Sequence, residues 1–286
     1  MTSPTEFVLG AASSDPITVR RLGYGAMRIT GPGIWDFPAD RDNAIAVVRA
    51  AVEAGVNFID TADSYGPESS EILLREALHP FSDVVIATKA GFTRQGPDQW
   101  TVVGHPAYLK QCLEMSLRRL GVETIDLYQL HRIDDTFPLE DQLGVFLEAA
   151  EQGKIRHIGV SEVTVEQLRA CQEIAPIVSV QNLYNAMNRQ HEELVDVCAA
   201  EGIGFIPWYP LGGRSVVEVS SALTEIANRR NVTPMAIAIA WLLQRSDVML
   251  PIPGTSSLSH LAENMVAGSI ELTESELLEI SQISQP

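Results

Sequence analysis

Short apolar runs alternate with longer amphipathic stretches along almost the whole chain. The runs have the length of strands, and the stretches have the 3.6-residue period of helices. The predicted strands are Leu22–Gly25, Phe58–Asp60, Val84–Thr88, Ile125–Leu130, His157–Val160, Val178–Gln181, Gly204–Pro207 and Met249–Pro251. The predicted helices include Arg41–Ala54, Pro106–Leu120, Pro138–Glu151, Val165–Ile174 and His191–Glu201. Strands that alternate with helices pair in parallel, and eight such units predict an α/β fold, a closed (β/α)8 TIM barrel.

Further segments extend this pattern at both ends of the chain. In Phe7–Val19 a Ser-Ser-Asp-Pro turn separates two apolar runs, which predicts an N-terminal β-hairpin. The successive helical patterns Val217–Arg230 and Pro234–Arg245 place an extra helix before strand 8. At the C-terminus, helices are expected around Ser257–Ala267 and over Thr273–Ile283, and the second of these begins with a capping box.

Composition and charge narrow the class of protein. The 286 residues are 45% hydrophobic and 20% charged, as in ordinary globular proteins, and without a linker or repeat we expect one domain over residues 1–286. The net charge of −17 disfavours nucleic acid and anionic membrane surfaces as partners. No apolar run approaches the ~18–20 residues of a membrane helix, and no secretory signal pattern is present. These features predict a cytoplasmic protein without a membrane segment.

The cysteine pattern agrees with that location. Cys112, Cys171 and Cys198 are too few and too scattered for a disulfide framework. All three fall in partly apolar helical stretches. We therefore expect buried free thiols in a reducing compartment.

Polar side chains follow several of the predicted strands. Asp60 ends one strand and Tyr65 lies in the loop after it, while Lys89 and His131 close the next two strands. Because a barrel keeps its active site at the carboxyl ends of its strands, these side chains are expected to share one mouth. Taken alone, each of these four side chains would more often be solvated, paired with an opposite charge or packed in the structure than catalytic. The later strand ends contribute Ser161, Glu162, Gln181, Asn182 and Trp208.

This set of residues favours proton transfer to an oxygen. A phenol with its ordinary pKa near ~10 is a poor acid at neutral pH, and a nearby ammonium is expected to lower that pKa. A carboxylate would orient the ammonium, and a neutral histidine can hold a carbonyl oxygen by a hydrogen bond. The six histidines form no His-x-His or His-Glu-x-x-His set, so no metal site is predicted. Neither a Gly-x-Ser-x-Gly elbow nor a Walker phosphate loop is present.

Over nearly its whole length the chain resembles an aldo-keto reductase. The matching motifs are Arg21-Leu22-Gly23-Tyr24-Gly25-Ala26-Met27, Asp60 to Tyr65, Thr88-Lys89, Asp126-Leu127-Tyr128-Gln129-Leu130-His131, Ile158-Gly159-Val160-Ser161 and Pro251-Ile252-Pro253-Gly254-Thr255. Three further stretches resemble a bacterial branch of the family that includes pyridoxal reductases. These are Gly31-Pro32-Gly33, Ala240 to Ser246 and Pro253-Gly254-Thr255-Ser256-Ser257.

The resemblance implies a nicotinamide cofactor across the barrel mouth and a catalytic tetrad. Tyr65 would donate the proton, Lys89 would tune its pKa, Asp60 would pair with Lys89, and His131 would orient the substrate. The implied cofactor contacts are Gly25, Met27, Asp60, Ser161, Gln181, Trp208, Leu211, Gly213, Gly254, Thr255, Ser256, His260, Glu263 and Asn264.

Several of these positions depart from the family pattern. Glu162 stands where the family often has Asn, which puts one carboxamide contact in doubt, and Trp208 replaces the usual stacking tyrosine. Gly254 and His260 stand where NADPH-preferring members commonly carry Lys or Arg. With Thr255 and the following helix start available for a phosphate, NADPH is still favoured, and NADH is the alternative.

The expected reaction is the reduction of an aldehyde or ketone to an alcohol by a monomer acting on a small carbonyl substrate. Pyridoxal is the first candidate, because the pocket loops Ile29–Pro38, Gly91–Val103 and Arg132–Phe137 include aromatic residues. The candidate pocket walls are Arg28, Trp35, Phe92 and Trp100. The alternatives are a broad-specificity reductase, a non-catalytic nicotinamide-sensing subunit, and a lyase or isomerase that uses Lys89 for a Schiff base.

Overall fold

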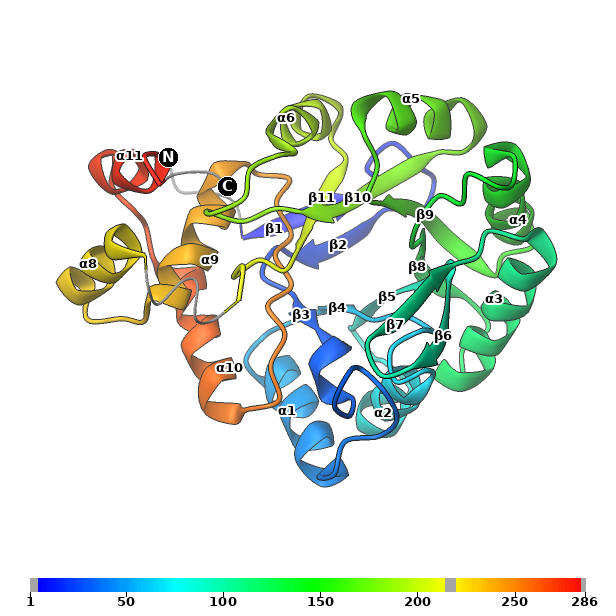
Figure 1. Ribbon diagram of the computed structural model, residues 1–286, viewed down its shortest axis with the longest axis horizontal. Coiled ribbons are helices and arrows are strands. Elements are labelled where there is room, and N and C mark those ends of the chain that lie inside the picture. Colours follow the sequence, from blue (N-terminus) through cyan, green and yellow to red (C-terminus); the bar gives the residue numbers. More distant parts are fainter. Residues whose placement is uncertain (1–4, 214–219, 284–286) are drawn as a thin grey trace.

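Seven parallel strands in the order β11-β10-β9-β8-β5-β4-β3 form the curved central sheet of this computed structural model, which describes residues 5–213 and 220–283 (Figure 1). The strands of the sheet are β3 (Tyr24–Gly25), β4 (Phe58–Asp60), β5 (Val85–Ala90), β8 (Ile125–Leu130), β9 (Ile155–Ser161), β10 (Ile177–Leu183) and β11 (Gly204–Trp208). Each is short and almost fully buried, as expected of parallel strands that are covered on both faces.

The predicted eighth strand closes this sheet into a barrel. Met249 forms a parallel bridge with Phe205 of β11, and Leu250 N donates to Phe205 O at 2.8 Å. On the other side Gly23 N donates to Pro251 O at 2.9 Å, next to β3. The segment therefore joins the two edges of the sheet, which confirms the (β/α)8 barrel.

Helices surround the barrel and lie between successive strands (Figure 1). They are η1 (Ala26–Ile29), α1 (Arg41–Glu53), α2 (Ser69–Leu78), α3 (Pro106–Leu120), α4 (Leu139–Glu151), α5 (Val165–Ile174), α6 (Glu192–Glu201), α8 (Ser221–Arg230), α9 (Pro234–Arg245), α10 (Leu258–Met265), η2 (Val266–Ser269) and α11 (Glu274–Ser281). Within residues 5–213 and 220–283, none of these helices has the length and apolar character needed to cross a membrane.

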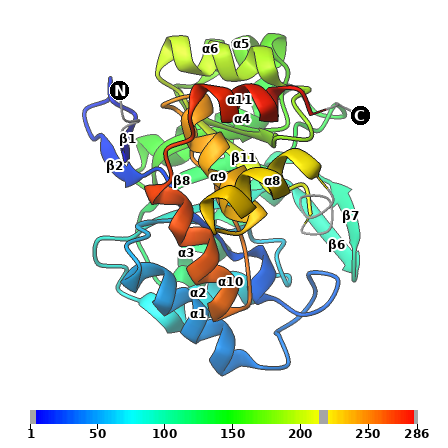
Figure 2. The ribbon, with the colours of Figure 1, turned by 90° about the vertical axis from the view of Figure 1, so that its left-hand side faces the viewer.

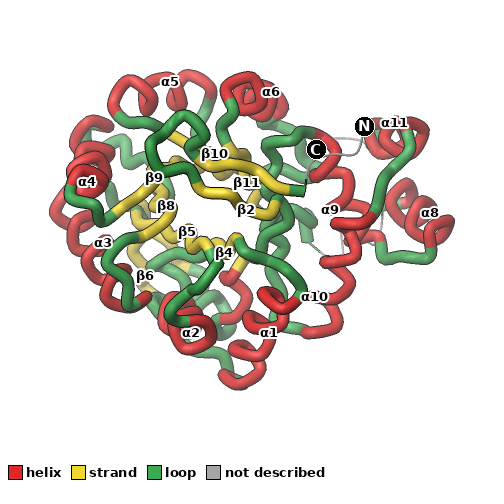
Figure 3. Tube along the Cα trace, turned by 180° about the vertical axis from the view of Figure 1, so that it is seen from behind, coloured by secondary structure: helices red, strands yellow, loops and turns green. Residues whose placement is uncertain are grey.

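Two hairpins lie at opposite ends of the barrel (Figure 2). The predicted N-terminal hairpin pairs β1 (Glu6–Leu9) with β2 (Ile17–Arg20) and lies across one opening of the barrel (Figure 3). Its Leu9 and Val19 pack with Phe58, Leu127 and other apolar side chains of the barrel interior. The second hairpin, β6 (Phe92–Gly96) with β7 (Gln99–Val102), follows β5 at the carboxyl end of the strands.

The order of elements agrees with the sequence analysis, and the differences are local. The strand predicted over Leu22–Gly25 is reduced to β3, and the helix predicted over Ser257–Ala267 becomes α10 followed by the 3-10 turn η2. The predicted helix Val217–Arg230 is α8 from Ser221 onward, and its first three positions lie outside the described residues. The capping box at the start of α11 is present, with Thr273 and Glu276 bonded to each other's backbone N–H groups.

Helix α2 and the β6–β7 hairpin were not predicted. The hairpin falls in the loop Gly91–Val103, where Pro97 and Asp98 occupy the turn and Asp98 has a φ of 55°. A Pro-Asp turn between β-prone residues such as Phe92 and Trp100 is the signal that could have indicated it. The hairpin matters for function because it projects over the mouth of the barrel.

Candidate active site

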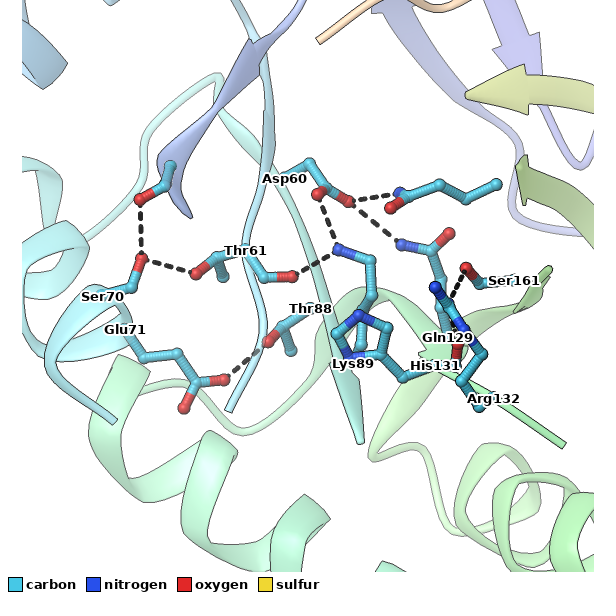
Figure 4. A network of polar contacts seen from close by, with 12 residues as sticks. Asp60, Thr61, Ser70, Glu71, Thr88, Lys89, Gln129, His131, Arg132 and Ser161 are labelled. Carbon is cyan, nitrogen blue, oxygen red and sulfur yellow. Dashed lines mark hydrogen bonds and ion pairs between the residues drawn. The ribbon is translucent and has the colours of Figure 1, made fainter. Parts of the chain in front are cut away.

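The predicted tetrad comes together at the carboxyl ends of β4, β5 and β8, and Figure 4 shows three of its members, Asp60, Lys89 and His131. Asp60 is the last residue of β4, Lys89 lies near the end of β5, and His131 follows β8 directly. Lys89 Nζ lies 2.6 Å from Asp60 Oδ1 and 5.3 Å from the centroid of the Tyr65 ring. The rings of Tyr65 and His131 meet edge to face, with centroids 5.8 Å apart.

Asp60 and Lys89 form a buried ion pair with few free hydrogen-bonding positions. Asp60 Oδ2 accepts from Gln129 Nε2 at 3.2 Å and from Gln181 Nε2 at 2.8 Å, and Lys89 Nζ also donates to Thr61 O at 2.8 Å (Figure 4). Burial lowers the pKa of Lys89, and the carboxylate of Asp60 opposes this shift by favouring the ammonium. These bonds hold the ammonium in one place beside Tyr65.

Tyr65 is buried, with 7% of its surface exposed. Burial, and then the negative charge of Asp60, raise the pKa of its phenol above the ordinary value. The expected lowering of this pKa by the ammonium of Lys89 is wrong for this structure. The positive charges that act to lower it are those of Arg132 and Arg94, and burial together with the charge of Asp60 outweighs them. Tyr65 therefore carries its proton at neutral pH and is available as a donor.

His131 is neutral in this environment. Burial lowers its pKa well below the ordinary value, and the positive charges of Lys89 and Arg132 act in the same direction. Its Nδ1 is buried and has no hydrogen-bond partner among the described residues. A neutral imidazole beside Tyr65 can donate a hydrogen bond to a substrate oxygen, as the sequence analysis expected.

A cavity of about 540 Å³ opens over the tetrad. Asp60, Tyr65 and His131 line it, whereas Lys89 lies behind them and is 0% exposed. Of the four candidate pocket walls, Arg28, Phe92 and Trp100 line the cavity and Trp35 does not. The volume is within the range of small-molecule sites.

Most of the predicted cofactor contacts line the same cavity. These are Gly25, Met27, Asp60, Ser161, Gln181, Trp208, Leu211, Gly213, Gly254, Thr255, His260 and Asn264. Ser256 and Glu263 are not part of this lining. Ser256 O instead accepts from Asn43 Nδ2 of α1 at 2.8 Å, which holds the segment before α10 against the barrel.

Two glycines let backbone segments approach each other at one wall of the cavity. A Cβ on Gly254 would lie 2.6 Å from Gly25 O, and a Cβ on Gly25 would lie 2.6 Å from Ile252 O. Neither position has room for a side chain. The result is a bare, rigid backbone wall, which suits close contact with a flat or extended ligand.

Glu162 and Trp208 form a pair that the sequence did not reveal. Trp208 Nε1 donates to Glu162 Oε1 at 2.5 Å, and the same oxygen accepts from Leu183 N at 2.6 Å. The carboxylate of Glu162 thus faces the indole and the backbone of β10. Its position fixes the plane of Trp208 at the end of β11.

Two arginines near the mouth were also missed as site residues. Arg132 lines the cavity, and its Nη1 donates to His131 O at 2.6 Å and to Ser161 Oγ at 3.1 Å (Figure 4). Arg94 of β6 stacks on Trp100, with Cζ 3.6 Å from the ring centroid, and donates to Ile34 O and Ser64 O. The position of Arg132 directly after His131 is the one sequence signal that could have indicated it.

Comparison with known proteins decides the family. A sequence model of the aldo/keto reductase family matches residues 21–285. The chain belongs to the aldo-keto reductase family. It is therefore an oxidoreductase, and the family assignment made from its motifs is confirmed.

Relatives of this aldo-keto reductase cover its whole length. It is 48% identical to an uncharacterised oxidoreductase of Schizosaccharomyces pombe, over 92% of this chain and 86% of that protein. It is 42% identical to pyridoxine 4-dehydrogenase of Escherichia coli over 99% of both chains. The crystal structure of an aldo-keto reductase from Klebsiella pneumoniae in complex with NADPH is similar, with a TM-score of 0.84, 26% identity and coverage of 100% of this chain and 96% of that one.

The three cysteines of this aldo-keto reductase do not line the cavity. Cys112, Cys171 and Cys198 are buried free thiols. Across the described residues, no group of three or more His, Cys, Asp or Glu side chains is placed to hold a metal ion. The candidate chemistry therefore rests on the tetrad and the polar groups beside it.

Proposed function

We propose that this aldo-keto reductase reduces a small aldehyde to the primary alcohol with NADPH, and that Tyr65 donates the proton. The observation that carries this proposal is the buried, neutral phenol of Tyr65 beside the Lys89–Asp60 pair and the neutral imidazole of His131. An aldehyde oxygen that accepts a hydrogen bond from His131 would lie next to the Tyr65 hydroxyl, and its carbon would remain open to the cavity.

NADPH is the proposed reductant. When bound, it supplies the hydride that reduces the carbonyl carbon. The cavity fits such a group, because Gly25 and Gly254 leave a bare backbone wall, Trp208 offers a flat face, and the amide of Gln181 is a hydrogen-bonding group. The NADPH complex of the Klebsiella pneumoniae relative supports this choice.

Each tetrad residue has a distinct part in the proposed proton transfer. Tyr65 gives its proton to the oxygen as that oxygen becomes an alkoxide. The ammonium of Lys89 stabilises the phenolate that remains, and Asp60 keeps this ammonium charged and in place. His131 orients the oxygen without gaining a net charge, because its pKa lies well below the neutral range.

Pyridoxal is the proposed first substrate. The aromatic rings of Tyr65, Phe92 and Trp100 form one edge of the cavity, with the Phe92 and Trp100 centroids 5.4 Å apart. Such a wall suits a flat aromatic aldehyde. The Escherichia coli relative is a pyridoxine 4-dehydrogenase, and the similarity covers 99% of both chains.

Two rival functions fit the structure less well. A Schiff base on Lys89 needs an accessible amine, but Lys89 is 0% exposed and its Nζ is bonded to Asp60 and Thr61 O. A sensing subunit without activity would not need the complete tetrad. A broad-specificity reductase uses the same tetrad, so only the substrate comparison separates it from the pyridoxal proposal.

The test is a comparison of kcat/KM for pyridoxal, substituted benzaldehydes and short aliphatic aldehydes at saturating NADPH. We expect pyridoxal to exceed the aliphatic aldehydes by roughly tenfold or more, the selectivity that one well-filled apolar pocket supplies. Equal values would contradict the pyridoxal assignment and leave a general carbonyl reductase. No turnover with any aldehyde would contradict the reductase proposal itself.

A further inference from the structure

The cavity has two chemically different ends. At one end lie Tyr65, His131 and Arg132, from β4, β8 and the loops that follow them. At the other end lie Gly254, Thr255, His260 and Asn264, from the segment before α10 and from α10 itself. A dinucleotide with its reacting ring over the tetrad extends toward this second end, which is therefore the place for the adenosine part of NADPH.

Two arginines line the cavity in the described part of the chain, one at each end. Arg132 is held at the catalytic end of the cavity. Its Nη1 donates to His131 O and Ser161 Oγ, and its guanidinium interacts electrostatically with Glu162. Arg28 ends the 3-10 turn η1 that follows β3 and is exposed at the cavity wall. The Arg28 side chain lies beside Gly254: its Cγ would be 3.7 Å from a Cβ placed on that glycine.

Within residues 5–213 and 220–283, no acceptor forms a hydrogen bond or ion pair with the guanidinium of Arg28. Its five N–H donors therefore remain available to a ligand. A planar guanidinium matches the oxygens of a phosphate monoester in two-bond geometry, which an imidazole or a hydroxyl does not.

The segment beside Arg28 cannot carry a cation of its own at position 254. A side chain there would collide with Gly25 O, 2.6 Å from the Cβ position. The surrounding bonds prevent relaxation, because Tyr24 Oη donates to Thr255 O at 2.5 Å and Asn43 Nδ2 donates to Ser256 O at 2.8 Å. A cation that serves this end of the cavity has to come from the neighbouring segment, and Arg28 is placed there.

We propose that Arg28 binds the 2′-phosphate of NADPH and is the residue that makes this enzyme prefer NADPH to NADH. This inference rests on the proposed use of NADPH. The 2′-phosphate is the one charged group that distinguishes the two cofactors, and Arg28 is the arginine at the adenosine end of the described cavity lining. In a chain with a net charge of −17, a cation at this point of the cavity provides local attraction for a phosphate.

The experiment measures binding without a carbonyl substrate, so that turnover plays no part. Isothermal titration calorimetry gives the dissociation constants of NADPH, NADH, adenosine 2′,5′-bisphosphate and 5′-AMP for the wild type and Arg28→Met. Arg118→Met is the matched control, because Arg118 is an exposed arginine on α3 that does not line the cavity. Arg28→Lys keeps the charge and loses the two-bond geometry.

We expect Arg28→Met to weaken the binding of NADPH and of adenosine 2′,5′-bisphosphate by roughly 10- to 100-fold, because charge-assisted hydrogen bonds are lost. The dissociation constants of NADH and 5′-AMP should stay within about twofold of the wild type. The NADPH affinity of Arg28→Lys should lie between those of Arg28→Met and the wild type, and Arg118→Met should bind as the wild type does. Unchanged NADPH affinity in Arg28→Met would overturn the proposal. Equal weakening of NADPH and NADH would also overturn it, by assigning Arg28 to a group common to both. A wild type that binds no nicotinamide nucleotide would instead overturn the proposed function.

Discussion

Burial shifts the pKa values of the ionisable side chains at this cavity in opposite directions. It raises the pKa of Tyr65 and lowers the pKa of Lys89 and His131, because in each case the charged form loses hydration. At neutral pH the phenol keeps its proton and the imidazole stays neutral. The one ammonium that remains is held by Asp60. A neutral phenol, a neutral imidazole and a fixed positive charge therefore exist together at the cavity, as the proposed proton transfer requires.

Asp63, two residues before Tyr65, shows the same effect away from the cavity. Burial, and then the charge of Glu71, raise its pKa to about 7, and Oδ1 has no hydrogen-bond partner among the described residues. Because the folded pKa lies above the ordinary value of 3.8, the folded state binds this proton more tightly. This contribution to stability is present at low pH and is lost as the pH rises from about 4 to about 7.

We expect Asp63→Asn to remove this pH-dependent loss of stability. Relative to the wild type, its free energy of unfolding should rise by roughly 1–4 kcal/mol between pH 5 and pH 8, because the amide cannot ionise. Urea unfolding at several pH values measures the difference. Parallel stability curves for the two proteins would show that Asp63 does not titrate in this range.

At the scale of elements, the β6–β7 hairpin builds the aromatic wall of the cavity. Arg94 ties it to the barrel by donating to Gly33 O at 2.9 Å, to Ile34 O at 2.7 Å and to Ser64 O at 2.8 Å. The same guanidinium covers the ring of Trp100. One side chain thus fixes the loop before α1, the loop that carries Tyr65 and the hairpin relative to one another.

We expect Arg94→Met to lower kcat/KM for the aldehyde by roughly tenfold or more, since several charge-assisted hydrogen bonds are lost. Hydrogen exchange of residues 92–102 should become faster in the same variant. Gln95→Ala is the control, because its side chain bonds only within the hairpin, to Thr93 and Thr101. Unchanged kinetics and exchange in Arg94→Met would contradict this role.

The strand ends were predictable from sequence because the barrel rule brings residues distant in the chain to one mouth. Asp60, Lys89 and His131 are each next to a short apolar run, so the rule places them together. The direction of the Tyr65 pKa was not predictable, because it depends on how deeply the ring is buried. The bond between Glu162 and Trp208 joins two positions 46 residues apart, and no local pattern encodes it.

At the scale of the whole molecule, stability and chemistry lie at opposite ends of the barrel. The β1–β2 hairpin closes the end away from the cavity (Figure 3). Its Leu9, which is 0% exposed, packs into the barrel interior. The tetrad lies at the other end with the β6–β7 hairpin, and Figure 2 shows the two hairpins on opposite sides. A barrel of this kind separates the two tasks, because loops at one end can vary without disturbing the core.

We expect Leu9→Ala to cost about 2–5 kcal/mol of unfolding free energy while kcat/KM of the folded enzyme stays unchanged. Val8→Ala is the matched control, because the neighbouring Val8 is 39% exposed. Urea unfolding and steady-state kinetics below the transition measure both effects. The same unfolding curve tests the prediction of one domain over residues 1–286, which requires a single cooperative transition.

The central claim is that the phenol of Tyr65 supplies the proton in carbonyl reduction, and the most direct test is the rate of NADPH oxidation by Tyr65→Phe. The variant keeps the aromatic ring and loses only the hydroxyl. With aldehyde and NADPH both saturating, we expect the rate to fall by roughly 10²–10⁴-fold, while the dissociation constant of NADPH measured by calorimetry is unchanged. A variant that retains more than about a tenth of the wild-type rate would contradict the claim, because another group would then be the acid.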